Sequence, residues 1–184
     1  MPLSRRVAGF ALAAALTFTM AQAEEAPHAE PGPSDITVAR MVELIEALDE
    51  TAETAGSTVR FRIADRPLMF VYDETSRRMR IMTAVAPEAS LEKPDLLRLM
   101  QANFDSALDA RYAIAQSVVW SVFIHPLDGL SEAEFVSAIS QTATLALTYG
   151  STFSSGSVVF GGGDSQGLLE DELKDTLKEK GVPI

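Results

Sequence analysis

Apolar residues recur every three or four positions after Ser34, which is the period of a helix that buries one face. Ser34 or Asp35 would cap the start of this helix, and Gly56 is placed to end it. Acidic residues fill the opposite side. The sequence therefore predicts an amphipathic helix whose apolar face carries Val38, Met41, Val42, Ile45 and Leu48.

The pattern then changes to period two, as expected of strands in which successive side chains point to opposite faces. Residues 58–63 alternate between apolar and polar, a continuous apolar run covers Leu68 to Tyr72, and alternation returns from Arg78 to Val85. The turns between these runs are marked by Asp65–Pro67 and Asp73–Ser76. Three short strands joined by tight turns predict an antiparallel meander.

A second helical stretch opens with Pro94 and Asp95, which are residue types favoured in the first turn of a helix. Two further strand-like runs follow it, Arg111–Ala115 and Val118–His125, and the second holds Trp120, the single tryptophan of the chain. The apolar side of this helix would carry Leu96, Leu97, Met100, Phe104, Ala107 and Leu108.

Ser131 and Glu134 have the spacing of a capping box, in which each side chain satisfies a free backbone N–H at the start of a helix. Apolar residues continue at helical spacing from there to Gly150, which would end this third helix. The order helix, three strands, helix, two strands, helix predicts an α+β domain at residues 35–150. We expect an antiparallel sheet with the helices packed mainly on one face.

Residues 1–23 have the three parts of a secretory signal peptide: a basic start, an uncharged apolar run and the small-residue cleavage site Ala21–Ala23. Val7–Gly9 follows the two arginines, where a twin-arginine signal usually has larger apolar residues, so the general secretory (Sec) route is favoured. Residues 24–34 hold three prolines and a glycine, which is typical of a disordered linker. The sequence thus predicts an exported, periplasmic protein.

Serine and glycine dominate the first half of residues 151–184, which predicts a flexible tail beyond the domain. Near its end, Leu169, Leu173 and Leu177 lie four residues apart among acids and lysines. This narrow apolar stripe predicts a short amphipathic surface helix that makes few contacts or docks only on a partner.

The chain has no cysteine, which excludes disulfide scaffolds, cysteine-ligated metal sites and thiol enzymes. Its 15 Lys and Arg against 26 Asp and Glu give a net charge of -11, and removal of residues 1–23 would take away two arginines and no acid. This acidic balance argues against nucleic acid as a partner, because phosphate backbones are bound by a surplus of basic residues. After residue 23 no apolar stretch reaches the length of a membrane-spanning helix, so we expect no integral membrane segment in the mature protein.

Two short motifs point to a known family. Leu96–Phe104 begins with two leucines and ends in Asn-Phe, and Pro126–Leu130 has the pattern Pro-Leu-x-x-Leu. Over residues 36–150 the chain resembles the YbjN-like bacterial sensory transduction regulators and the related class I type III secretion (Tir) chaperones, which carry such motifs at their second helix and before their last one. The resemblance implies a homodimeric α/β sandwich that binds an extended segment of another protein, without a cofactor or a catalysed reaction. Secretion chaperones work in the cytosol, so the predicted export signal departs from that family.

Six basic residues lie within the predicted meander of an otherwise acidic protein. The alternation of its strands places Arg60 and Arg62 on the same solvent-facing side as Arg78 and Arg80. A guanidinium patch of this kind suits carboxylates or phosphates, so these four are our candidate partner-binding residues. The alternative is that they are ordinary exposed positions of a half-buried sheet.

Four apolar residues, Met69, Met82, Trp120 and Phe123, are predicted to belong to the core of the sheet. If some of them face outward instead, they would form a groove for a partner helix or strand, because methionine and aromatic side chains adapt well at such surfaces.

His125 is the single histidine of the predicted domain, and acidic residues follow it. A hydrolytic triad or a metal site would need a nucleophile or further ligands at fixed spacing, and no G-x-S-x-G, H-E-x-x-H or G-K-[ST] motif occurs. We expect a structural role for His125 and an Asp109–Arg111 ion pair that fixes a turn. The sequence predicts no catalytic, cofactor-binding or metal-binding residues.

We therefore predict a non-enzymatic protein-binding module, chaperone-like or regulatory, whose partners are another protein and a second copy of the chain. The alternative is an envelope enzyme or small-ligand binder with a site between the sheet and the helices.

Overall fold

The computed structural model describes residues 35–105, 107–150, 164–182 and 184. The predicted signal peptide, the linker and most of the glycine-rich tail lie outside these residues. None of the described helices is both long and apolar enough to span a membrane. The elements are α1 (Val38–Leu48), β1 (Glu53–Ala55), β2 (Thr58–Ile63), β3 (Arg66–Asp73), β4 (Arg78–Pro87), the 3-10 helix η1 (Glu88–Ser90), α2 (Lys93–Asp105), β5 (Arg111–Ala115), β6 (Val118–Pro126), α3 (Glu132–Leu147) and α4 (Asp164–Glu179).

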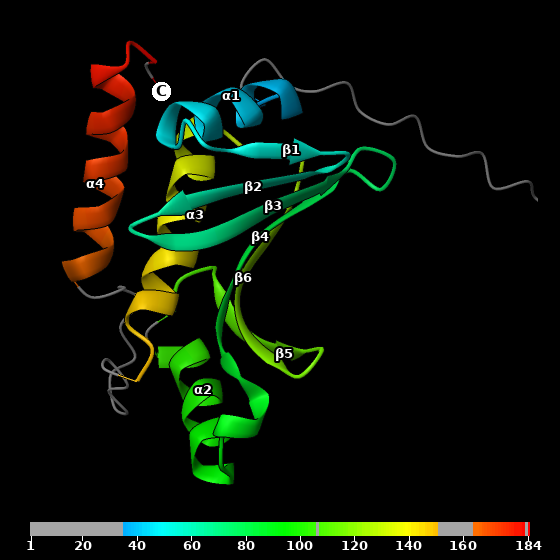
Figure 1. The fold of residues 1–184 in the computed structure, drawn as a ribbon, viewed down its shortest axis with the longest axis vertical. Coiled ribbons are helices and arrows are strands. Elements are labelled where there is room, and N and C mark those ends of the chain that lie inside the picture. Colours follow the sequence, from blue (N-terminus) through cyan, green and yellow to red (C-terminus); the bar gives the residue numbers. More distant parts are fainter. Residues whose placement is uncertain (1–34, 106, 151–163, 183) are drawn as a thin grey trace, which may run out of the picture.

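Six strands of the described chain form one antiparallel sheet in the order β1-β2-β3-β4-β6-β5. Strands β2, β3 and β4 are the predicted meander, and β6 pairs along the length of β4. Figure 1 shows α1, α3 and α4 gathered on one side of the sheet, whereas α2 lies beyond the end of α3, beside β5. The predicted α+β class, with an antiparallel sheet and helices mainly on one face, is confirmed.

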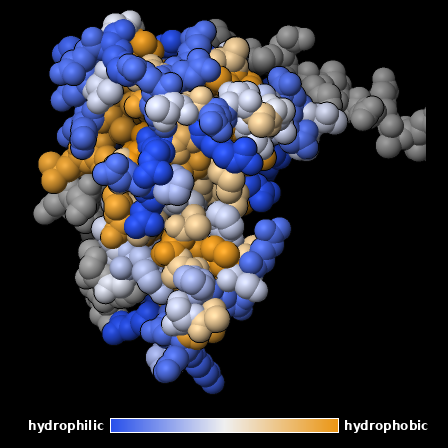
Figure 2. All heavy atoms as spheres, in the orientation of Figure 1, coloured by the Kyte–Doolittle hydropathy of each residue, from blue (hydrophilic) through white to orange (hydrophobic). Residues whose placement is uncertain are grey.

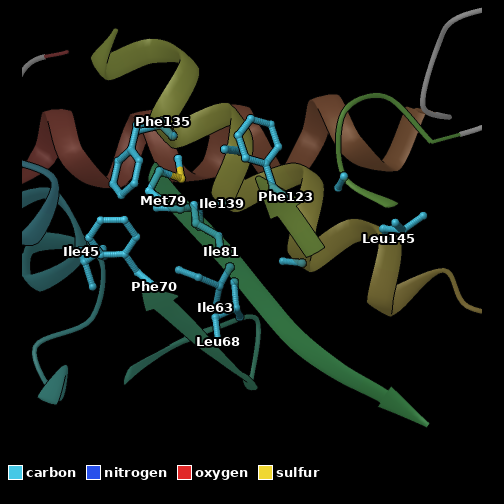
Figure 3. Close-up of a cluster of buried hydrophobic side chains, with 14 of the residues drawn as sticks. Ile45, Ile63, Leu68, Phe70, Met79, Ile81, Phe123, Phe135, Ile139 and Leu145 are labelled. Atoms are coloured by element: carbon cyan, nitrogen blue, oxygen red, sulfur yellow. The ribbon is translucent and has the colours of Figure 1, made fainter. Parts of the chain in front are cut away.

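The face of the sheet that meets α3 carries the apolar half of each alternating strand. Phe70 of β3 and Ile81 of β4 are fully buried there, as is Phe135 at the start of α3. The rings of Phe70 and Phe135 meet edge to face with their centroids 5.3 Å apart, a favoured geometry for aromatic pairs. Figure 3 shows these side chains lying together between the two strands and the helix. This core is what the period-two pattern of the meander predicted.

Helix α1 covers the predicted apolar residues from Val38 to Leu48, but it begins later and ends earlier than the predicted cap and stop residues suggested. Its N-cap is Thr37, whose hydroxyl accepts a hydrogen bond from a first-turn N–H, and is neither Ser34 nor Asp35. The helix ends at Leu48, and the residues that precede Gly56 form β1. This strand was not predicted, because its three residues are all exposed and are held by backbone pairing with β2 rather than by an apolar pattern.

Helix α4 is longer and more deeply packed than the predicted surface helix with few contacts. Leu169, Leu173 and Leu177 are at most 8% exposed and belong to the main core. They dock on α3 and α1, and Glu170 also accepts a hydrogen bond from Ser137 of α3 at 2.9 Å. The docking is possible because α3 is apolar around most of its circumference, with the sheet on one side and α4 on the other (Figure 1).

Candidate functional site

The second face of the sheet carries the exposed or half-buried half of each strand. Figure 1 shows this side turned away from α3. The side chains that point to this side, which we call the open face, include Glu53 on β1, Thr58, Arg60 and Arg62 on β2, Pro67, Met69, Val71 and Asp73 on β3, Arg78, Arg80, Met82 and Ala84 on β4, Arg111 and Ala113 on β5, and Trp120, Val122 and Ile124 on β6.

The strand register decides which side chains of the open face are neighbours. Arg60 lies opposite Met69 on the next strand, and Met69 lies opposite Met82. Further along β4, Ala84 lies opposite Trp120. Residues directly opposite each other in an antiparallel pair have Cβ atoms about 4.5 to 5.5 Å apart, so these side chains are in contact range. An apolar strip therefore crosses three adjacent strands, β3, β4 and β6.

Arginines border this strip on two sides. Arg60 and Arg62 stand on β2, and Arg78 and Arg80 stand at one end of β4, all four of them exposed. Arg62 donates to the carbonyl oxygen of Asp65. Within the described chain, none of the four forms an ion pair with a carboxylate. The structure thus places the four candidate residues on one face, while their partner-binding role stays a prediction.

The aspartates beside these arginines direct their oxygens to their own turns. The hydroxyl of Ser76 donates to Asp73 at 2.6 Å, which lowers the pKa of Asp73. Burial raises the pKa of Asp49, but hydrogen bonds from Thr51 and from the backbone N–H of Arg62 outweigh it and hold this pKa below its usual range. Both carboxylates are therefore ionised and already hydrogen-bonded at neutral pH, and the positive charge of Arg62 adds to the lowering of the pKa of Asp49.

A shallow cavity of about 390 Å³ hollows the open face over the apolar strip. Met69, Met82 and Trp120 line it, with Arg60 and Glu53 among its rim residues. These three apolar side chains face outward, as the groove alternative required. The indole of Trp120 is fixed by a 3.0 Å hydrogen bond from its Nε1 to a carbonyl oxygen on the β5 side, so the cavity wall is held in place. By contrast, Phe123 is 5% exposed and belongs to the core of the sheet, as was predicted for all four residues.

A second cavity of about 410 Å³ lies where β5 stops and β6 continues, against α3. His125 lies in its wall, with Nδ1 2.7 Å from the carbonyl oxygen of Pro126. The side-chain oxygen of Gln141 accepts from the N–H of Asp109 at 2.9 Å. The predicted ion pair between Asp109 and Arg111 is absent from the described salt bridges, and Arg111 donates to a neighbouring carbonyl oxygen instead. These polar groups thus hold the fold, and no cluster of His, Asp or Glu in the described chain could bind a metal ion.

Helix α2 presents its leucine-rich side to solvent rather than to the core. Its buried residues are Leu99 and Ala102, whereas Leu97, Met100 and Phe104 are 57%, 58% and 71% exposed. The lower part of Figure 2 shows apolar surface over α2 and β5. The helical period of these residues was predicted from the sequence, but their exposure was not, because period alone does not say what covers a face.

A single polar side chain, Asn103, ties α2 to the edge strand β5. Its amide oxygen accepts from the N–H of Tyr112 at 2.7 Å, and its amide nitrogen donates to the carbonyl oxygen of Tyr112 at 3.0 Å. The N–H and C=O groups of Tyr112, which point away from β6, thereby have hydrogen-bond partners. Sequence reasoning noted Asn103 only as part of a motif, because nothing local indicates that it caps a strand.

No family model and no curated protein matches the chain. Among solved structures, it is similar to a chain of the HopA1–SchA chaperone–effector complex, with 10% sequence identity and a TM-score of 0.45. The similarity covers 59% of this chain and 91% of that one. At this level of similarity the function of the present chain has to be argued from its own residues, and its resemblance to the YbjN-like proteins stays a prediction.

Proposed function

We propose that this protein is a periplasmic, non-enzymatic module that binds another protein through its open face, in a chaperone-like or regulatory role. The observation that carries the proposal is the apolar strip of Met69, Met82 and Trp120, bordered by exposed arginines that form no ion pair among the described residues. Methionine and aromatic residues beside arginine are the side chains most enriched at protein interfaces. An exposed apolar patch rimmed by polar groups is typical of such sites.

The rival proposal, a small-ligand or catalytic site between sheet and helices, has less support. That interface is filled by fully buried side chains such as Phe70, Phe135 and Ile139. Of the two cavities described above, one lies on the open face. The other lies between the end of β6 and α3, and the side chains of Gln141 and His125 in its wall are already hydrogen-bonded to the backbone. A ligand site of the usual kind needs converging polar groups that the fold does not already use.

A test of the proposed function expresses the full-length chain with a C-terminal tag, crosslinks it in the cell and captures the mature protein. The wild type is compared with the double variant Arg60→Glu, Arg80→Glu, and with Lys178→Glu, Lys180→Glu as a control of equal charge change. Both control lysines are exposed and lie at the end of α4, away from the open face. We expect a defined crosslinked species with the wild type and the control but not with the arginine variant. The same species in all three samples would refute a role for the open face.

Homodimer formation is a second part of the proposal, and the exposed side of α2 is the proposed dimer interface. A continuous apolar row at helical spacing is formed by Leu97, Met100 and Phe104. Burying this row against another surface removes apolar area from water and is therefore favourable. Analytical ultracentrifugation of the mature protein should show a dimer at micromolar concentration. Leu97→Glu with Met100→Glu should give a monomer, while Leu168→Glu, an equally exposed leucine on α4, should not.

Periplasmic location rests on the predicted signal peptide. Cleavage after Ala23 is tested by mass spectrometry of the protein recovered from a periplasmic extract, which should begin at Glu24. Recovery of the protein in the cytosol with residues 1–23 intact would overturn this part of the proposal.

A further inference from the structure

We propose that the open face binds an amphipathic helix whose apolar stripe is bordered by carboxylates. This inference rests on the proposed function and names the class of partner segment. Two properties of the open face carry it: four exposed arginines around an apolar centre, and backbone N–H and C=O groups that are used within the sheet.

The charge of the border selects the partner. Arg60, Arg62, Arg78 and Arg80 place four guanidinium groups around the apolar strip of a protein whose net charge is -11. Guanidinium groups form their strongest hydrogen bonds with carboxylates, often in a two-point geometry. A second copy of the chain is a poorer fit, because arginines outnumber the carboxylates of Glu53 and Asp73 on this face, and a two-fold axis would bring like charges together.

The backbone of the open face favours a helix over an extended segment. Strands β3 and β4 have a paired neighbour on each side, so their N–H and C=O groups are used in the sheet. A segment that lies across this face meets side chains only, and it must satisfy its own backbone groups. A helix does so internally, whereas a single extended strand does not. The distinction matters because strand addition takes place at a sheet edge and not on its face.

The dimensions of the apolar strip fit one short helix. From β3 to β6 it spans two strand spacings, about 9 to 10 Å, which is close to the 10 to 12 Å diameter of a helix with its side chains. Along β6 it runs from Trp120 to Ile124, four residues and about 13 Å. That is about two and a half helical turns. The cavity between Met69, Met82 and Trp120 would receive one large apolar side chain from the stripe.

Trp120 makes the inference directly measurable, because it is the single tryptophan of the chain and it lines the cavity. The mature protein is titrated with synthetic peptides of about 15 residues that lack tryptophan and tyrosine. One peptide has a leucine stripe bordered by glutamates, a second has the same stripe bordered by lysines, and a third is the first with a central proline that breaks the helix. Trp120 emission and peptide helicity by circular dichroism are followed, at low and at high salt.

We expect the glutamate-bordered peptide to shift Trp120 emission, to gain helicity and to bind at least about tenfold more tightly than the other two, with weaker binding at high salt. Arg60→Glu with Arg80→Glu should reverse the preference between the glutamate and lysine peptides, and Lys178→Glu with Lys180→Glu should leave it unchanged. Equal binding of the glutamate and lysine peptides, or full binding of the proline peptide, would overturn the inference. So would a response of Trp120 to anionic phospholipid vesicles but not to any peptide.

The two proposals fail separately. If no peptide binds but the crosslinked species still requires Arg60 and Arg80, the open face binds a protein of another shape and only the inference falls. If the crosslinked species is also independent of these arginines, the proposed function falls as well.

Discussion

Asn103 is predicted to hold α2 onto the sheet, and its replacement by alanine should loosen this helix. The two hydrogen bonds to the backbone of Tyr112 measure 2.7 and 3.0 Å and are partly buried. A hydrogen bond of this kind contributes about 0.5 to 1.5 kcal/mol net, so Asn103→Ala should lower the free energy of unfolding by about 1 to 3 kcal/mol. The cost is concentrated in α2 because little else attaches this helix, whose buried residues include only Leu99 and Ala102 among the apolar ones.

Urea unfolding followed by circular dichroism measures this loss. With a slope of about 2 kcal/mol per molar urea, a loss of 2 kcal/mol moves the midpoint down by about 1 M. Asn103→Asp is the informative second variant, because its carboxylate still accepts from the N–H of Tyr112 but cannot donate to the carbonyl oxygen. It should fall between the wild type and the alanine variant. Hydrogen exchange should also speed up in α2 and β5 before the rest of the sheet.

The reasoning about Asn103 would be refuted by a midpoint within about 0.2 M of the wild type together with unchanged exchange in α2. That result would mean that water replaces the amide at no cost, and that the contacts of Leu99 and Ala102 are sufficient. A control variant at the neighbouring Gln101 separates this effect from a general change in helix propensity. Gln101 is exposed, and no hydrogen bond of its side chain is among those described. Gln101→Ala should have a midpoint equal to or above that of the wild type.

Three further predictions concern stability. The two-residue Ala64–Asp65 turn has positive φ at both positions, so its replacement by Asn-Gly should raise the urea midpoint, by roughly 0.5 to 1 kcal/mol in free energy. The folded-state pKa values of Asp49 and Glu134 are lowered, so these carboxylates stabilise the fold fully above their unfolded pKa values of about 4, and the stabilisation is lost as the pH falls below them. Urea midpoints measured from pH 7 to 3 should therefore decline below about pH 5, and less so in Glu134→Gln. A flat profile would contradict this. Leu173→Ala should cost about 2 to 5 kcal/mol, because Leu173 is 6% exposed, whereas Leu168→Ala at a 71% exposed position should cost little; equal effects would mean that α4 is not docked.

Local patterns predicted the elements whose side chains alternate between core and solvent. The meander is the clearest case: Phe61 and Ile81 are buried and Arg60 and Arg80 exposed, as the period-two pattern required. The capping box at the start of α3 was predicted for the same reason, since the residues that form it are three apart. Interactions of this kind are decided within a few residues and are therefore visible in the sequence.

The remaining features depend on contacts between distant residues. The pairing of β4 with β6 brings Trp120 beside Ala84, and this completes the cavity of the open face, but neither strand alone specifies its neighbour. The docking of α4 was missed for a related reason. A narrow stripe such as Leu169 and Leu173 predicts weak contacts unless the partner surface, here α3, is also known to be apolar. Only the arginine half of the candidate site was therefore predicted with its orientation.

The two exposed apolar surfaces differ in the charge around them, and this separates their proposed roles. The exposed charges of α2 include both signs, Lys93, Asp95 and Arg98, so two copies of this helix can meet across a two-fold axis with opposite charges in reach. The open face has four exposed arginines around its apolar strip, more than the carboxylates of Glu53 and Asp73 on the same face, and it is suited to a carboxylate-bordered segment. A variant that abolishes dimer formation through α2 should consequently still bind the glutamate-bordered peptide. A protein that lost both properties together would have to use one continuous interface instead.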